Sequence, residues 1–191
     1  MSRAALAIVI LILLFVVGVG IVYMRRSLPI VAPSPSRTLN SLPATMKISS
    51  SAFQDSQPIP AAYTCDGANS NPPLTFSSVP ENARSLVLIV DDPDAPNGTW
   101  DHWVVFNIPP MTREIEEGQA RQGVTGTGSS GATAYQGPCP PSGEHRYMFK
   151  LYALDTELDL AVGVNKKAVE EAMQGHILAQ AQLIGLYIRK Q

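Results

Sequence analysis

One stretch decides the fold of this 191-residue chain: Asp91–Pro110, which reads DDPDAPNGTWDHWVVFNIPP. An apolar run precedes it, Ser85–Val90 (SLVLIV), and a second lies inside it, Trp103–Ile108 (WVVFNI). Short runs of β-branched and aromatic residues that end at acids or prolines are typical of β-strands. Because proline fixes the backbone, polar side chains held between prolines at strand ends indicate a small, preorganised pocket.

The rest of the domain continues this pattern outward. Arg146–Leu154 (RYMFKLYAL) alternates in polarity and predicts another strand. Asn165 is a good N-cap for a helix containing Ala168–Met173, which Gly175 would end. Ile177–Ile188 would extend this helix or form the last strand, and its C-terminal end favours a strand. We therefore predict a mainly β fold, an antiparallel two-sheet β-sandwich with one or two small helices.

The N-terminus has a different composition. Ala4–Met24 is a run of 21 residues without a charge, and as a helix it would span roughly 30 Å, the thickness of a bilayer's hydrocarbon core. It is longer than the roughly 7–15 apolar residues of a secretory signal and lacks a small-residue cleavage site. We expect a single N-terminal transmembrane helix as an anchor (residues 1–26), a Pro/Ser-rich linker (27–45) and a domain (46–191). A cleaved signal and a buried core helix are the alternatives.

The charges beside this run bear on its orientation. Arg25, Arg26 and Arg37 follow it and Arg3 precedes it, which by the positive-inside rule favours a cytoplasmic domain. Short N-terminal anchors followed by a whole domain commonly export that domain. We therefore expect a single-pass membrane protein with its domain on the extracytoplasmic side.

Composition narrows the partners of residues 46–191. This region holds ten of the 14 basic residues and all 16 acidic ones, a formal charge of −6. A nucleic-acid platform needs clustered Lys and Arg and is excluded, and a broad electrostatic hold on anionic lipid is disfavoured. The two cysteines, Cys65 and Cys139, lack C-x-x-C spacing. In an exported domain they would form a disulfide, and otherwise they would be two buried thiols.

A long glycine-rich segment, Gly118–Gly137, contains a formal G-x-G-x-x-G at Gly126, Gly128 and Gly131. A dinucleotide site needs that motif between a strand and the start of a helix. The residues that follow here start no helix. We therefore interpret the segment as a surface loop or a lip over the pocket.

The chemical candidates are Asp91, Asp92, Asp94, Asp101, His102 and His145. Each alone has a structural explanation, as a turn-capping acid or a packed histidine. Together they are more informative, because both histidines follow a Pro-rich turn and begin an apolar strand, so neighbouring strands would point both imidazoles at one rim.

Three chemistries use such a set: anion binding, a metal site of two histidines and a carboxylate, and acid–base hydrolysis. The chain has no G-x-S-x-G or H-E-x-x-H motif. Asp101 and His102 are adjacent, so on a strand they face opposite sides and cannot both bind one metal. The residues favour an anion or small polar ligand and leave the other two chemistries open.

At these residues the sequence resembles the phosphatidylethanolamine-binding protein family, above all its bacterial and archaeal branch, the Raf-kinase-inhibitor-like proteins. The matching elements follow the family's order and cover nearly all of residues 46–191: Tyr63–Gly67, Asn71–Leu74, Asp92–Pro96, Trp100–Trp103, Asn107–Pro110, Gly137–Pro141 and His145–Tyr147. The DPDAP box followed by HRY makes the resemblance specific.

The resemblance implies an antiparallel β-sandwich with a shallow pocket for phosphate, acetate or a phosphoethanolamine head group. The residues that it implies for this pocket are Asp92, Trp100, His102, His145 and Tyr147 as its lining, Asp94 as a brace of the DPDAP turn, and Gly137 where backbone approaches the ligand. It implies no metal, no cofactor and no catalytic residue. We expect a membrane-tethered, non-enzymatic protein that binds a small anionic or phosphorylated ligand. The alternative is an interaction protein that inhibits a protease or kinase.

Overall fold

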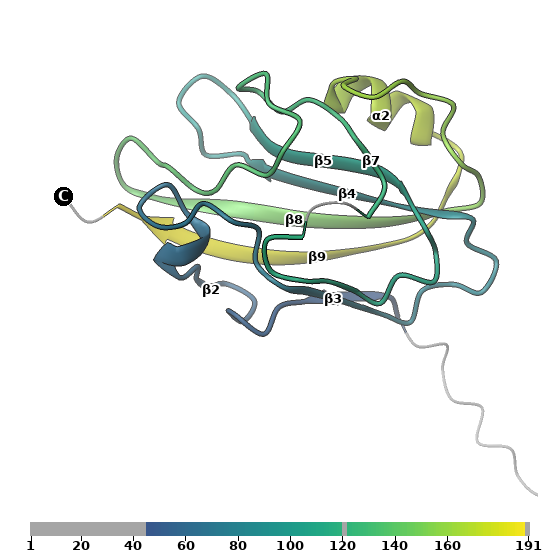
Figure 1. Cartoon of the computed structure of the whole chain (residues 1–191), viewed down its shortest axis with the longest axis horizontal. Coiled ribbons are helices and arrows are strands. Elements are labelled where there is room, and N and C mark those ends of the chain that lie inside the picture. The colour runs from purple at the N-terminus through teal and green to yellow at the C-terminus, as the bar shows by residue number, and fades with distance from the viewer. Residues whose placement is uncertain (1–44, 120–121, 190–191) are drawn as a thin grey trace, which may run out of the picture. The chain divides into compact units, whose positions relative to one another are not determined.

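The computed structural model describes residues 45–119 and 122–189 (Figure 1). The expected anchor (1–26) and all but the last residue of the expected linker lie outside the described residues. Within the described part, no helix is long and apolar enough to cross a membrane.

The described residues form two β-sheets and one α-helix (Figure 1). The smaller sheet has the strand order β1 (Lys47–Ser49), β3 (Leu74–Ser77), β6 (Glu114–Ile115). The larger sheet has the order β2 (Gln57–Pro58), β9 (Ile177–Ile188), β8 (Glu144–Leu154), β4 (Ser85–Asp92), β5 (Trp100–Ile108), β7 (Val124–Thr125). The helix is α2 (Lys166–Met173), and one 3-10 turn, η1, covers Ala61–Tyr63.

This arrangement confirms the prediction of a mainly β, two-sheet fold with small helices. The expectation that all strands are antiparallel is wrong for one pair, because β2 runs parallel to β9. β2 has two residues and lies at the edge of the sheet, where the missing N–H of Pro58 is tolerated.

The core explains why the run SLVLIV is apolar without alternation. All eight residues of β4 are buried, because both faces of the larger sheet are covered at this strand. Leu86, Leu88 and Val90 belong to the main core cluster, which includes residues of the smaller sheet. Val87 and Ile89 belong to a second cluster that contains Val169 and Met173 of α2.

The C-terminal elements form as their sequence signals indicate. The Asn165 side chain accepts a hydrogen bond from the Ala168 N–H (3.0 Å), as an N-cap does. Gly175 then adopts a positive φ of 82° after the last helical residue. Ile177–Ile188 is a strand paired with β8 along its length, so the alternative in which the helix continues is wrong.

The register places three strand ends together. Asp92 at the end of β4 lies opposite Trp100 at the start of β5. Asp91 lies opposite Met148, close to the start of β8. The DPDAP segment, the first residues of β5 and the first residues of β8 therefore meet at one end of the larger sheet.

Candidate functional site

A cavity of about 680 Å³ opens at this end of the larger sheet. Six of the seven expected site residues line it, namely Asp92, Trp100, His102, Gly137, His145 and Tyr147. The other lining residues come from the loop Ala95–Thr99 and from Ser129, Gln136, Cys139, Pro140 and Pro141. We call it the histidine cavity. Asp94, the seventh expected residue, does not line it.

Asp92 orients His145. Its Oδ2 lies 2.7 Å from Nδ1 of His145, and both side chains are almost fully buried. Its Oδ1 accepts a hydrogen bond from the Asp94 N–H at 2.8 Å. Both carboxylate oxygens are therefore engaged within the protein, and Nε2 is the nitrogen that His145 has left for a ligand.

His102 is oriented by a backbone carbonyl. Its Nδ1 lies 2.8 Å from the Gln136 oxygen, and because a carbonyl can only accept, Nδ1 is the donor. Burial lowers the pKa of His102, opposed by the bond to Gln136 and by the charge of Asp92. Its Nε2 has no partner among the described residues, and it is not one of the fully buried unpaired atoms, so solvent reaches it.

Tyr147 contributes a hydroxyl without a partner. Its residue is 1% exposed, and its ring meets the His102 ring edge to face at 5.2 Å. The hydroxyl is buried and makes no hydrogen bond with the described residues. Burial first, and then the charge of Asp92, raise its pKa, and the nearby Cys139 backbone acts against this rise. A neutral phenol therefore remains available as a donor.

Asp94 fixes the DPDAP turn from outside the cavity. Its carboxylate pairs with the Arg146 guanidinium at 2.7 and 2.9 Å and accepts the Arg146 backbone N–H at 3.0 Å. These bonds lower the pKa of Asp94 to about 2. The contact ties the turn after β4 to the start of β8.

The wall near Gly137 is built by contact between two loops. The Gly137 N–H donates to Oδ1 of Asn69 at 2.7 Å. A Cβ at position 137 would lie 2.7 Å from Cα of Thr64 and would also clash with the Tyr63 carbonyl. The described structure therefore requires glycine here for loop packing, a different reason from the expected approach of backbone to ligand.

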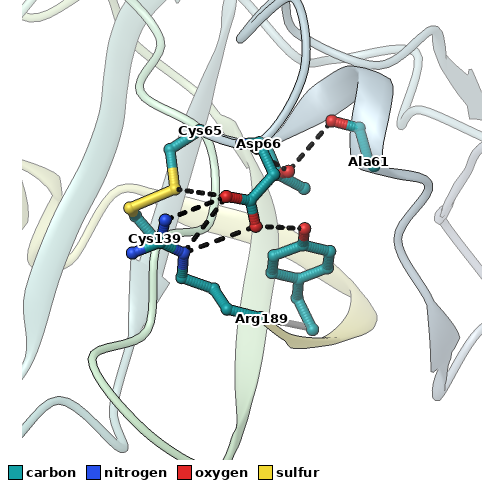
Figure 2. Close-up of polar contacts among 7 residues, drawn as sticks. Ala61, Cys65, Asp66, Cys139 and Arg189 are labelled. Carbon is teal, nitrogen blue, oxygen red and sulfur yellow. Dashed lines mark hydrogen bonds and ion pairs between the residues drawn. A yellow bond between two sulfur atoms is a disulfide. The ribbon is translucent and has the colours of Figure 1, made fainter. Parts of the chain in front are cut away.

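A disulfide joins the same two loops. Cys65 and Cys139 are bonded, with their Cα atoms 5.5 Å apart (Figure 2). Cys139 lines the cavity, so the bridge fixes one wall to the segment Tyr63–Gly67.

Asp66 anchors that segment to the end of β9, which sequence reasoning missed. Its carboxylate accepts hydrogen bonds from the Tyr187 hydroxyl at 2.7 Å and from Nη2 of Arg189 at 3.0 Å (Figure 2). The bond from Tyr187 is the main cause of the lowered pKa of Asp66. Asp66 and Tyr187 also border a second cavity of about 600 Å³, which contains none of the expected site residues. No local pattern could have indicated pairs more than a hundred residues apart.

The other face of β4 and β5 carries an ionic cluster. Asp91 is 1% exposed and lies 2.8 Å from Nζ of Lys150 and 3.2 Å from Nζ of Lys166. Lys166, the first residue of α2, also pairs with Asp101. Asp101 thus faces away from His102, as their adjacency on a strand predicts. The two candidates Asp91 and Asp101 therefore do not belong to the histidine cavity.

Comparisons with known proteins agree with the geometry. The model of the family described as phosphatidylethanolamine-binding protein matches residues 49–188. A UPF0098 protein from Methanothermobacter thermautotrophicus is 54% identical over 150 residues, covering 75% of this chain and 99% of the relative. A UPF0098 protein from Chlamydia trachomatis is 46% identical, covering 74% of this chain and 98% of the relative.

Solved structures give the same result. The crystal structure of a phosphatidylethanolamine-binding protein homolog from Chlamydia trachomatis superposes with a TM-score of 0.75 at 45% identity, covering 76% of this chain and 99% of that one. A family member from Escherichia coli superposes with a TM-score of 0.72 at 29% identity, covering 77% and 100%. The chain belongs to the phosphatidylethanolamine-binding protein family, in the branch that contains bacterial and archaeal members.

Proposed function

We propose that this protein is a membrane-tethered, non-enzymatic binding protein whose histidine cavity accepts phosphate or a phosphoethanolamine-like head group. One observation carries the proposal: the Tyr147 hydroxyl is buried and has no partner among residues 45–119 and 122–189, in a cavity that two oriented imidazoles also line. A buried unpaired donor costs free energy unless a ligand satisfies it.

The lining of the cavity suits a small polar group joined to a carbon chain. His102, His145 and Tyr147 bring polar atoms that are fixed by the fold to one end of the sheet. Trp100 is 42% exposed and, with the cavity-lining Pro140 and Pro141, offers an apolar rim. A few convergent polar groups beside apolar surface are what ligand pockets commonly present.

The side chains available for nucleophilic chemistry support a binding role. Cys139 is engaged in the disulfide, and Oγ of Ser129 accepts the Asp101 N–H at 2.8 Å. No described lining residue pairs a hydroxyl or thiol with a histidine, as activation of a nucleophile would need. We accordingly expect no turnover of phosphoesters.

The tether rests on the sequence and on the disulfide. The charge-free run in residues 1–26 would hold the domain at a membrane through the linker 27–45. A disulfide suits an oxidising compartment, and we propose that the domain lies on the extracytoplasmic side. Protease treatment of intact cells tests this: external protease should digest residues 46–191, and full protection would contradict the proposal.

The binding proposal is tested by NMR titration of the full chain with phosphate and with phosphoethanolamine. We expect the imidazole signals of His102 and His145 to shift, and His102→Ala to abolish the response. The matched control is His176→Ala, an exposed histidine paired with Asp155, which should leave the response intact. No shift at roughly millimolar ligand would instead favour the inhibitor of a protease or kinase, which a pull-down from native membranes would then seek.

A further inference from the structure

The histidine cavity lacks a permanent positive charge on its described lining. No Lys or Arg is among the described residues that line it, and its one carboxylate is Asp92. Arg146 lies close in sequence, but its guanidinium pairs with Asp94 outside the lining. If His145 is charged, Asp92 at 2.7 Å neutralises it. The described lining therefore offers a dianion no net attraction.

In the neutral His102 ring, the N–H proton lies on Nδ1 and is not available to an anion in the cavity. Because Nδ1–H is committed to the Gln136 carbonyl, the neutral ring presents a lone pair at Nε2. Burial disfavours the charged ring. The ionisable groups that surround it are Asp92, Asp91, Asp101, Tyr147 and His145. The lysine partners of Asp91 and Asp101 lie on the other sheet face.

A ligand for this cavity must therefore bring a hydrogen-bond donor as well as acceptors. An anionic oxygen suits the Tyr147 hydroxyl, but the same kind of oxygen facing Nε2 of His102 would set two acceptors against each other. A protonated phosphate monoester resolves this, because its P–OH donates to Nε2 while its other oxygens accept. A phosphodiester has no such proton.

We propose that the histidine cavity binds a phosphate group together with one proton, so that inorganic phosphate and phosphate monoesters in their monoanionic form are preferred over phosphodiesters such as an intact lipid head group. This inference rests on the proposed function, since it specifies the ligand class of the same cavity.

Calorimetric titration of the full chain tests the inference with three probes: inorganic phosphate, phosphoethanolamine and the diester glycerophosphoethanolamine. The second phosphate pKa of a monoester is about 6. At pH values above this pKa, binding requires the uptake of one proton. The affinity for phosphoethanolamine should therefore fall about tenfold for each pH unit. At about pH 6 the diester should bind about tenfold more weakly than the monoester, because it leaves Nε2 without a donor. The monoester titration is repeated in two buffers of different ionisation enthalpy. The difference between the two observed binding enthalpies gives the number of protons taken up on binding.

A variant locates the effect on His102. His102→Gln replaces the lone pair with an amide that can donate, and we expect the monoester preference to fall to within about twofold. His176→Gln is the matched control and should keep the full preference. Should the His102 variant fail to fold, the proton count of the unmodified chain still decides. A diester that binds as tightly as the monoester, with no pH dependence, would overturn the inference and leave the anion cavity standing. If no probe binds at any pH, the proposed function fails with it.

Discussion

The two faces of the β4–β5 pair use the same residue types in opposite ways. On the face toward α2, the carboxylates of Asp91 and Asp101 are paired with the ammonium groups of Lys150 and Lys166. On the other face, Asp92 orients His145, while Nε2 of His102 and the Tyr147 hydroxyl have no partner among the described residues. Asp91 and Asp92 are consecutive residues of β4, so their side chains point to opposite faces of the sheet.

This difference between the two faces indicates that one face contributes to stability and the other to ligand binding. A buried charge that is paired within the protein is costly to leave unpaired, and it offers nothing to a ligand. A buried polar atom without a partner weakens the folded state and becomes useful when a ligand arrives. The cluster around Asp91 should therefore carry stability, and the histidine cavity should carry recognition.

The largest effect is expected from Asp91→Ala, which leaves Lys150 without its counter-ion and Lys166 with Asp101 alone. Removal of one partner of a buried pair costs about 3 kcal/mol or more of unfolding free energy. Denaturant unfolding measures this, and phosphate affinity, corrected for folded fraction, should change much less. Asp155→Ala is the matched control: Asp155 pairs with His176 in an exposed contact and should cost less than about 1 kcal/mol. Equal losses in the two variants would break the distinction between the faces.

The sequence could predict the elements that are long and apolar. β4, β5 and β8 have eight to eleven residues, and each contains an apolar or alternating run of at least six residues, in which the composition or the alternation is visible. β1, β2, β6 and β7 have two or three residues each, too few to show a period. β7 also lies within the glycine-rich segment interpreted as a loop. These short strands form because the rest of the fold places their backbone beside a free edge.

The candidate site also has a part that the sequence could predict and a part that it could not. The sequence motifs and the family resemblance predict six of the residues that line the histidine cavity, because these residues lie in short, contiguous, recognisable motifs. The partners of Asp66 and Asp91 come from residues 59 to 123 positions away. Such pairs depend on the register of strands and on where a helix begins, which no local pattern encodes. The reason for Gly137 was likewise hidden, since it lies in the backbone of a second loop.

A smaller effect on stability is expected at two buried tyrosines, one with and one without a hydrogen-bond partner. Tyr135 donates its hydroxyl to the Tyr63 carbonyl at 3.0 Å, whereas the Tyr147 hydroxyl has no protein partner among the described residues. Tyr135→Phe should lower the unfolding free energy by about 1 kcal/mol, and Tyr147→Phe should leave it unchanged or raise it slightly. Phosphate affinity should fall about fivefold in Tyr147→Phe alone, since it loses a donor to the anion. Thermal unfolding and calorimetric titration of both variants check this, and a destabilised Tyr147→Phe would show that the hydroxyl serves the fold.

The smallest effect concerns an ion pair outside both clusters, Asp94 with Arg146. The Arg146 guanidinium lowers the pKa of Asp94 to about 2 in the folded chain, below the value of about 3.9 for an unfolded aspartate. The pair therefore stabilises the fold above about pH 4, and this contribution is lost as the pH falls through about 2. Its side chains are 54% and 30% exposed, so solvent screening should limit the contribution to less than about 1 kcal/mol. In Arg146→Gln, the unfolding free energy should fall by that amount less than in the unmodified chain as the pH is lowered from about 4 to about 2. Added salt should reduce this difference between the two proteins. A loss comparable to that of Asp91→Ala would mean that pairing alone, without burial, sets the stability of these charges.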